Sequence, residues 1–565
     1  MSQSSRLSKL FHNKIWTFLS DKDNNKKSAR IFYAVIMLLS CGFSLFMVSR
    51  HECFRDEAQA WLISRDVPLS GLFTQLKYEI HPILWFLVLM PFSKLGFPYI
   101  TMQIISWLFV SASLYILLFK LNVNKLLKAT LAFSPLFLYW YPAVSRNYSL
   151  AVFLLFLLMM YYPKRHEKPI RYAVTAALLF STHLIMLGIG LAVIVIEVAD
   201  IIVDKRNKIK LSIRRYIALG IEISGALFLY FQLSDAGNYN KDVGGFELEA
   251  LGFVDRLFTE LYCVLADVFC FDTTTKFFSY YNDGVLDIQF ILSTLVLMFL
   301  IMLFVLLIKR PRQLVLYILG AGCIVGMQTT IYFSNPHRTG FLHLLFLFII
   351  VTLDYEKIHP PKQRKDGKKD ININNKSVLT VFVTLICIAS IIISPFTYFI
   401  KDINGNFSGS KGVAEYLDKN VPDDVTVIGF WENNITSIIA YTKTRNEWYS
   451  THFYQTYTYV TWSDAYKEAS EKYRSQIYLE LEYIAFCKKF EIEYTMERIR
   501  FLDSFYETIK IISNKDDKVV VVFSKSINDI FKYDHSINKD KFVLVYTSES
   551  MYDTEESFFV YELTI

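Results

Sequence analysis

Apolar runs, each about as long as a membrane-spanning helix, recur over the first 400 residues of this 565-residue chain. A bilayer core ~30 Å thick requires about 20 apolar residues in a helix, which satisfies its own backbone hydrogen bonds. The sequence therefore predicts a polytopic α-helical membrane protein with about 11 transmembrane helices. We expect these at Ile31–Val48, Tyr99–Phe119, Ala129–Tyr141, Tyr148–Tyr162, the two halves of Tyr172–Ile202, Ile217–Leu233, Ile288–Ile308, Leu314–Phe333, Phe341–Leu353 and Val378–Ile400.

Two longer apolar stretches are each predicted to contain two helices. A single helix over Ala129–Tyr162 would run ~50 Å, but Pro142 and a polar turn interrupt it. Tyr172–Ile202 is interrupted by Ser181-Thr182-His183. A further apolar segment, Pro82–Leu95, is short for a span and suits an interfacial or re-entrant helix better.

Lysine and arginine residues gather in alternate loops, which predicts how the helices are oriented in the cell membrane. With the N-terminal segment 1–30 in the cytoplasm, every strongly basic loop falls on the inner side. These loops are 120–128, 164–171, 205–215, 309–312 and 362–369. The remaining polar segments are then outside, and they are 49–81, the turn at Arg146, 234–287, 334–340 and the tail from Lys401. The net charge of +6 adds little, because membrane orientation explains the lysines and arginines in the loops.

The tail alternates between helix-like and strand-like segments. The helix-like segments are Gly412–Lys419 and Asn433–Tyr441, and the strand-like segments are Val425–Phe430, Val519–Phe523 and Phe542–Tyr546. This alternation predicts a small extracytoplasmic α/β domain over residues 401–565, after a transmembrane domain over residues 31–400. Seven cysteines are too few for a disulfide scaffold of this size.

Ionisable side chains collect at the outer ends of the expected helices. Such groups are costly at a membrane edge, which makes them functional candidates. They are Asp56 and Glu57 after the first span, Glu79 and His81 before Pro82, Arg146 between two helices, His183 at the start of another, and His337 and Arg338 before Phe341. Structural explanations exist for each type: acids favour helix N-termini, histidines pack in helix interfaces and arginines reach toward lipid headgroups.

The sequence has no strong metal-ligand spacing, no phosphate-binding glycine loop and no nucleophile elbow. We predict no nucleic-acid partner. No motif indicates a cofactor, and a divalent metal is left open. A divalent metal would require the fold to bring His51, Asp56, Glu57 and His81 together. Glu197 and Glu222 lie inside apolar helices, where we expect them to face the bundle and to be paired.

Three segments resemble one family. Phe54–Trp61 (FRDEAQAW), after the first span, resembles the first outer loop of the GT-C superfamily of glycosyltransferases. Tyr78–Trp85 (YEIHPILW) is similar to the superfamily's second juxtamembrane helix, although Ile83 replaces a common second proline. Ser145–Leu150 (SRNYSL) is similar to its arginine-containing turn. The resemblance is best over residues 31–202, looser to Ile400, and closest to the protein O-mannosyltransferase and aminoarabinose transferase group; the tail from Gly412 resembles the outer α/β domain of some bacterial members.

The resemblance implies transfer of a sugar from a polyprenyl-phosphate donor to an extracytoplasmic acceptor, with inversion. It places the catalytic carboxylate at Asp56, beside Glu57. A carboxylate can take the proton of an attacking hydroxyl, and an arginine such as Arg146 or Arg338 presents a fork of donors that matches phosphate oxygens. Glu79, His81, His183 and His337 are the further expected substrate-binding residues. The expected partners are the donor lipid, the acceptor and membrane lipids.

Three other functions remain open on the sequence. A lipid-linked-glycan transporter or flippase would place polar groups near the bilayer midplane and often has inverted repeats. A polysaccharide polymerase or ligase would also use lipid-linked glycans. A non-enzymatic surface scaffold would bind a partner through its tail.

Overall fold

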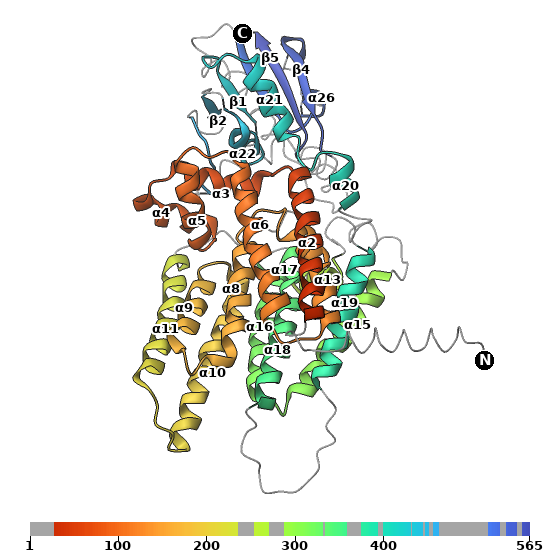
Figure 1. The fold of residues 1–565 in the computed structure, drawn as a ribbon. Helices are drawn as coiled ribbons and strands as arrows, with labels where there is room; N and C mark the ends of the chain where they lie inside the picture. Colours follow the sequence, from red (N-terminus) through yellow and green to blue (C-terminus); the bar gives the residue numbers. More distant parts are fainter. Residues whose placement is uncertain are drawn as a thin grey trace, which may run out of the picture. The chain divides into compact units, whose positions relative to one another are not determined.

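The structure is a computed structural model, largely helical with one small sheet (Figure 1). The residues that it describes are 27–234, 253–270, 288–331, 334–358, 375–393, 399–430, 432–443, 447–450, 456–462, 518–530, 538–550 and 556–564. The chain divides into two compact units. The first unit comprises residues 1–49, 81–85 and 103–400, and the second comprises 50–80, 86–102 and 401–565.

Long apolar helices dominate the first unit. Among the described residues, eight helical stretches are long and apolar enough to cross a membrane. They are α2 (Lys27–Arg50), α6 (Ile100–Tyr115) with η1 (Ile116–Lys120), η4 (Leu184–Met186) with α10 (Leu187–Arg206), α11 (Ile213–Leu233), α15 (Ile288–Leu307), α16 (Pro311–Thr330), α17 (Pro336–Thr339) with α18 (Phe341–Ile358), and α19 (Asn375–Ile393). The chain is therefore a multi-pass membrane protein, as the sequence predicts.

The predicted number of eleven spans is not confirmed. Three apolar helices are shorter: α5 (Leu84–Lys94), α8 (Tyr148–Tyr161) followed by η3 (Tyr162–Lys164), and α9 (Pro169–Phe180). The span expected at Ala129–Tyr141 is instead divided between α7 (Lys125–Ala132) and the π-helical turn η2 (Leu136–Trp140). Pro135 explains the division, because a proline lacks the amide donor and disfavours helical geometry in the residue before it.

Glycines allow close helix packing in the first unit. A Cβ atom at Gly188 of α10 would overlap the carbonyl oxygen of Leu319 and the side chain of Cys323, both in α16. A Cβ atom at Gly225 of α11 would lie 2.7 Å from Cα of Ala177 in α9. Small residues permit such approach between membrane helices, where packing and not water exclusion drives association.

The sheet belongs to the second unit and has the strand order β2-β1-β3-β5-β4. Its strands are β1 (Val427–Gly429), β2 (Trp448–Ser450), β3 (Lys518–Phe523), β4 (Phe542–Ser548) and β5 (Phe558–Thr564). β1 pairs in parallel with β2 and β3, whereas β5 is antiparallel to β3 and β4. The helices of this unit include α3 (Arg55–Asp66), α4 (Leu69–Glu79), α20 (Phe399–Asn404), α21 (Ser410–Asn420), α22 (Glu432–Tyr441) and α26 (Ile527–Ile530). The predicted α/β tail is thus present, and residues 50–80, predicted to form the first outer loop, belong to the same compact unit.

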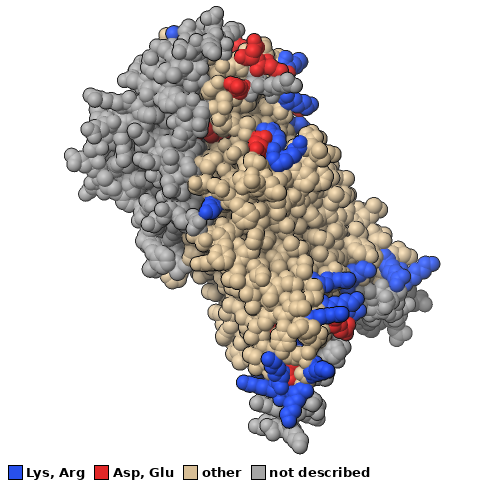
Figure 2. Space-filling model, turned by 90° about the vertical axis from the view of Figure 1, so that its left-hand side faces the viewer, with Lys and Arg blue, Asp and Glu red and all other residues tan. Residues whose placement is uncertain are grey.

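Basic side chains concentrate at loops of the first unit. The loops after α8 and α10 expose Lys164, Lys168, Arg171, Lys205, Arg206, Lys208, Lys210 and Arg214. Figure 2 shows lysines and arginines gathered toward the lower end of the view, below a broad surface with few charged side chains. This pattern agrees with the rule used to orient the helices, and the orientation itself stays a prediction. Segment 1–26, which the sequence places in the cytoplasm, lies outside the described residues, as do most of the predicted outer loop 234–287 and the basic loop 362–369.

Candidate functional site

The predicted site residues fall in both compact units, and each unit is considered by itself. The first unit has His81, Arg146, His183, His337 and Arg338, and the second has Asp56, Glu57 and Glu79.

The basic residues of the first unit surround one tyrosine, Tyr148, at the start of α8. Arg338 Nε donates a hydrogen bond to the Tyr148 hydroxyl at 3.1 Å. The Arg146 guanidinium carbon lies 5.6 Å from the centre of the Tyr148 ring. The rings of His183 and His337 lie 4.9 and 4.4 Å from the same centre. Tyr148 is fully buried, and all four basic side chains lie around it.

His81 extends this group, which we call the basic cluster: His81, Arg146, His183, His337 and Arg338. Arg146 Nη2 lies 3.0 Å from His81 Nε2, within hydrogen-bonding distance. The His81 carbonyl oxygen accepts a hydrogen bond from Gln232 Nε2 at 3.1 Å, which ties this short segment to α11. Positions far apart in sequence are thus brought together within one unit.

Local capping fixes the turns that present the basic cluster. The His183 ring accepts, through Nδ1, a hydrogen bond from the Ile185 amide at 3.1 Å, so the side chain caps η4. Asn335 Oδ1 accepts from the His337 amide at 3.3 Å and caps α17 in the same way. Side-chain acceptors at such positions satisfy amides that the helix leaves without partners.

The electrostatic environment of the basic cluster favours an anion. Burial lowers the pKa of His183 well below its ordinary value, and the neighbouring basic side chains, which include the guanidinium groups of Arg338 and Arg146, lower it further. Two permanently charged guanidinium groups in a buried setting interact strongly with a phosphate.

His337 has hydrogen-bonding capacity left within the basic cluster. The residue is 4% exposed, and neither of its ring nitrogens has a hydrogen-bond partner among the described residues. Buried polar atoms in native proteins usually have a partner. A ligand oxygen beside Tyr148 would supply one.

In the second unit, Asp56 and Glu57 have opposite environments. Asp56 is exposed in the first turn of α3, whereas Glu57 is fully buried. Glu57 Oε2 accepts from the Phe54 amide at 3.1 Å and lies 3.4 Å from Nε2 of His51. His51 Nδ1 in turn lies 3.0 Å from Oδ2 of Asp402. Glu57 therefore caps and anchors the helix that presents Asp56.

Glu79 is held by amides at the end of α4. Gln59 Nε2 donates to Glu79 Oε1 at 2.9 Å, and Gln75 Nε2 donates to the same oxygen at 3.3 Å. Gln59 also binds Val460 of the tail, whose amide donates to Gln59 Oε1 at 3.0 Å. Gln59 lies one helical turn after Asp56, so this network anchors α3 at a second point.

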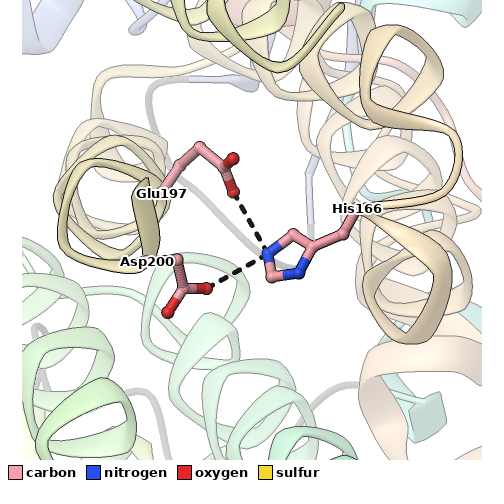
Figure 3. A group of neighbouring side chains, drawn as sticks. All are labelled: His166, Glu197 and Asp200. Atoms are coloured by element: carbon pink, nitrogen blue, oxygen red, sulfur yellow. Dashed lines mark ion pairs between the residues drawn. The ribbon is translucent and has the colours of Figure 1, made fainter. Parts of the chain in front are cut away.

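The acids and histidines considered for a metal fall in both units. His81 belongs to the first unit, and His51, Asp56 and Glu57 belong to the second. Within the described part of the chain, the group with metal-ligand spacing is instead His166, Glu197 and Asp200 (Figure 3). His166 Nε2 lies 3.6 Å from Glu197 and 3.2 Å from Asp200.

Arginine side chains already neutralise the charge of the two carboxylates in the group of His166, Glu197 and Asp200. Asp200 accepts hydrogen bonds from Arg165 and Arg312, both at 2.8 Å. Glu197 accepts one from Arg215 at 2.9 Å. Glu197 is thus paired in the bundle, as expected from the sequence. Three guanidinium groups beside these oxygens oppose a divalent cation, so the group is a structural ion network.

Comparison with known proteins gives similarity to solved structures only. No family model matches the chain, and no curated protein matches it. The chain is similar to ArnT from Cupriavidus metallidurans bound to undecaprenyl phosphate, with 10% identity and a TM-score of 0.42, over 94% of this chain and 97% of that chain. The apo state of ArnT gives 11% identity, a TM-score of 0.41 and the same coverage. At this level of similarity, the activity has to follow from the residues of the chain.

Sequence reasoning missed the residues that organise these groups. Tyr148 stands in the Ser145–Leu150 turn, yet nothing in its spacing marks it as the centre of the basic cluster. His51 and Asp402 are 351 positions apart and form one buried ion pair with Glu57 nearby. Contacts between residues so far apart in sequence produce no local sequence pattern that would predict them.

Proposed function

We propose that the chain is a membrane glycosyltransferase that transfers a sugar from a polyprenyl-phosphate-linked donor to an extracytoplasmic acceptor, with inversion at the sugar. The basic cluster around Tyr148 is the observation on which the proposal rests. The resemblance of Phe54–Trp61 to the first outer loop of GT-C enzymes supports it independently. A lipid carrier also explains why the helices that bear the cluster are those of a membrane protein.

In this proposal, Arg146 and Arg338 bind the donor phosphate. Each guanidinium is already oriented, Arg146 by His81 and Arg338 by Tyr148. Pre-oriented donors stabilise charge that develops on a leaving group without paying for reorganisation during the reaction. His337 supplies a further ring N–H from the same turn as Arg338.

Asp56 acts as the base in this proposal. Its carboxylate takes the proton of the acceptor hydroxyl as that oxygen forms a bond to the anomeric carbon. The bond between the anomeric carbon and the phosphate oxygen breaks in the same step, and the lipid phosphate leaves with the electron pair. A single displacement inverts the anomeric centre. We assign this role to Asp56 rather than Glu57, because Glu57 is buried beside His51.

A transfer assay with a radiolabelled polyprenyl-phosphate sugar tests the proposal. We expect the purified protein to move label from the lipid to a mixture of envelope lipids and glycans. Arg146→Ala and Arg338→Ala should each weaken donor binding about ten- to a hundredfold, since a hydrogen bond to a charged group contributes roughly 1.5–3 kcal/mol. Arg206→Ala, at the exposed arginine that ends α10, is the matched control and should bind donor normally.

Three results would overturn the proposal. If both cluster variants bind donor as tightly as the wild type, the basic cluster does not bind the phosphate. Movement of intact lipid-linked sugar across vesicles without transfer would favour the transporter, and joining of lengthened glycan chains would favour the polymerase.

A further inference from the structure

The residues just before Asp56 are attached to C-terminal segments of the second unit. The Cys53 amide donates to the Tyr441 hydroxyl at 2.8 Å. The Arg55 side chain donates through Nη1 to Asn434 Oδ1 at 2.9 Å. Asp56 itself is exposed and directly follows these attached residues.

Glu556 makes the most direct of these attachments. Its Oε1 accepts a hydrogen bond from the Arg55 amide at 3.3 Å, at the first residue of α3. Its Oε2 accepts from the hydroxyls of Ser408 at 2.7 Å and Ser437 at 3.4 Å. All three side chains are fully buried. The carboxylate therefore links the start of α3 to segments before α21 and within α22.

This contact has a double effect on α3. The first amides of a helix have no partner within the helix, and a carboxylate outside it satisfies one of them. Negative charge at a helix N-terminus is also favourable with respect to the helix dipole. Glu57 satisfies the Phe54 amide from inside the helix, and Glu556 satisfies the Arg55 amide from outside.

We propose that Glu556 is a positioning residue for Asp56: the C-terminal domain fixes the first turn of α3, and with it the carboxylate that acts as base. This inference rests on the proposed function for its catalytic consequence. Its structural part, that Glu556 holds the start of α3, stands on the hydrogen bonds alone. It gives the C-terminal domain a role in catalysis that requires no contact with substrate.

Kinetics of the full-length protein test the catalytic part. Glu556→Ala should lower kcat about 10- to 100-fold, the cost of a misplacement of roughly 1 Å, and change the donor KM by less than twofold. Glu556→Gln keeps an oxygen for the Arg55 amide and should recover most of the loss. Adding Glu556→Ala to the Asp56→Asn variant should slow its turnover by less than about a further twofold, because the effects of substituting residues that act as a unit are not additive.

Amide hydrogen exchange of α3 tests the structural part without any assay of activity. We expect faster exchange over Arg55–Asp66 in Glu556→Ala and in the milder Asn434→Ala, which loses the contact to the Arg55 side chain. Glu447→Ala is the matched control, because this exposed carboxylate contacts the Tyr449 hydroxyl and not α3. If Glu556→Ala does not fold, Glu556→Gln and Asn434→Ala decide the matter.

The outcomes separate the two proposals. Unchanged exchange in α3, or a normal kcat in Glu556→Ala while Asp56→Asn is inactive, would overturn the positioning role. The positioning role would also be overturned if turnover in the double variant, Asp56→Asn with Glu556→Ala, fell by the product of the two single losses. Faster exchange in α3 together with no transfer by the wild-type protein would uphold the structural role of Glu556 and reject the proposed activity.

Discussion

Asp56 and Glu57 are adjacent in sequence, and their surroundings predict different effects on substitution. Asp56→Asn removes a charge from an exposed side chain, so folding and donor binding should persist while turnover falls about 10²–10⁴-fold. Glu57→Gln removes charge from a buried carboxylate beside His51, so it should lower stability first. Transfer rates and melting temperatures of the two purified variants measure the difference. Normal turnover in folded Asp56→Asn protein would eliminate Asp56 as the base.

His51 predicts a pH dependence of stability. Burial acts to lower its pKa, but the charge of Asp402 and hydrogen bonds to Asp402 and Glu57 raise it to about 10. Since the pKa of the folded state is above the unfolded value, the stabilisation is complete below about pH 6.5 and is lost as pH rises through about 10. His51→Gln should therefore cost about 3–5 kcal/mol near neutral pH. Melting temperatures from pH 6 to pH 10 should converge for the two proteins; a constant gap would contradict this.

At the scale of elements, the approach of α10 to α16 depends on Gly188. Gly188→Ala would place a methyl group against the backbone of Leu319, which cannot move aside as a flexible side chain can. We expect a loss of about 1–3 kcal/mol from overpacking. Gly322 lies in α16, the helix that Gly188 approaches. A Cβ atom added at Gly322 would have no atom within 4 Å, so Gly322→Ala should be neutral. Thermal unfolding in detergent compares the two variants. Equal melting temperatures would show that α10 and α16 can move apart without loss of stability.

At the scale of the whole molecule, the basic loops predict an inward N-terminus and an outward tail. Asp423 in the tail and Lys210 after α10 are both exposed. Asp423→Cys should react with a membrane-impermeant maleimide in intact cells, and Lys210→Cys should react only after permeabilisation. Wild-type protein gives the background from native cysteines, which are buried or half-buried among the described residues. The reverse labelling pattern would place Asp56 inside and refute the proposed function as well.

The sequence by itself determined the membrane class, most of the long helices and the α/β character of the tail. These follow from local physics, because bilayer thickness sets the length of an apolar helix and pleating sets the pattern of a strand. The break at Pro135 was also present in the sequence, but the apolar run around it dominated the prediction.

Only the tertiary structure decided which candidate residues meet. It placed Tyr148 at the centre of the basic cluster, and it joined Arg55 to Glu556, 501 positions away. It also moved α3 into the compact unit of the tail, although the sequence groups that loop with the membrane helices. Each of these depends on packing between distant segments, whose free energy is spread over many small contacts and has no period along the chain.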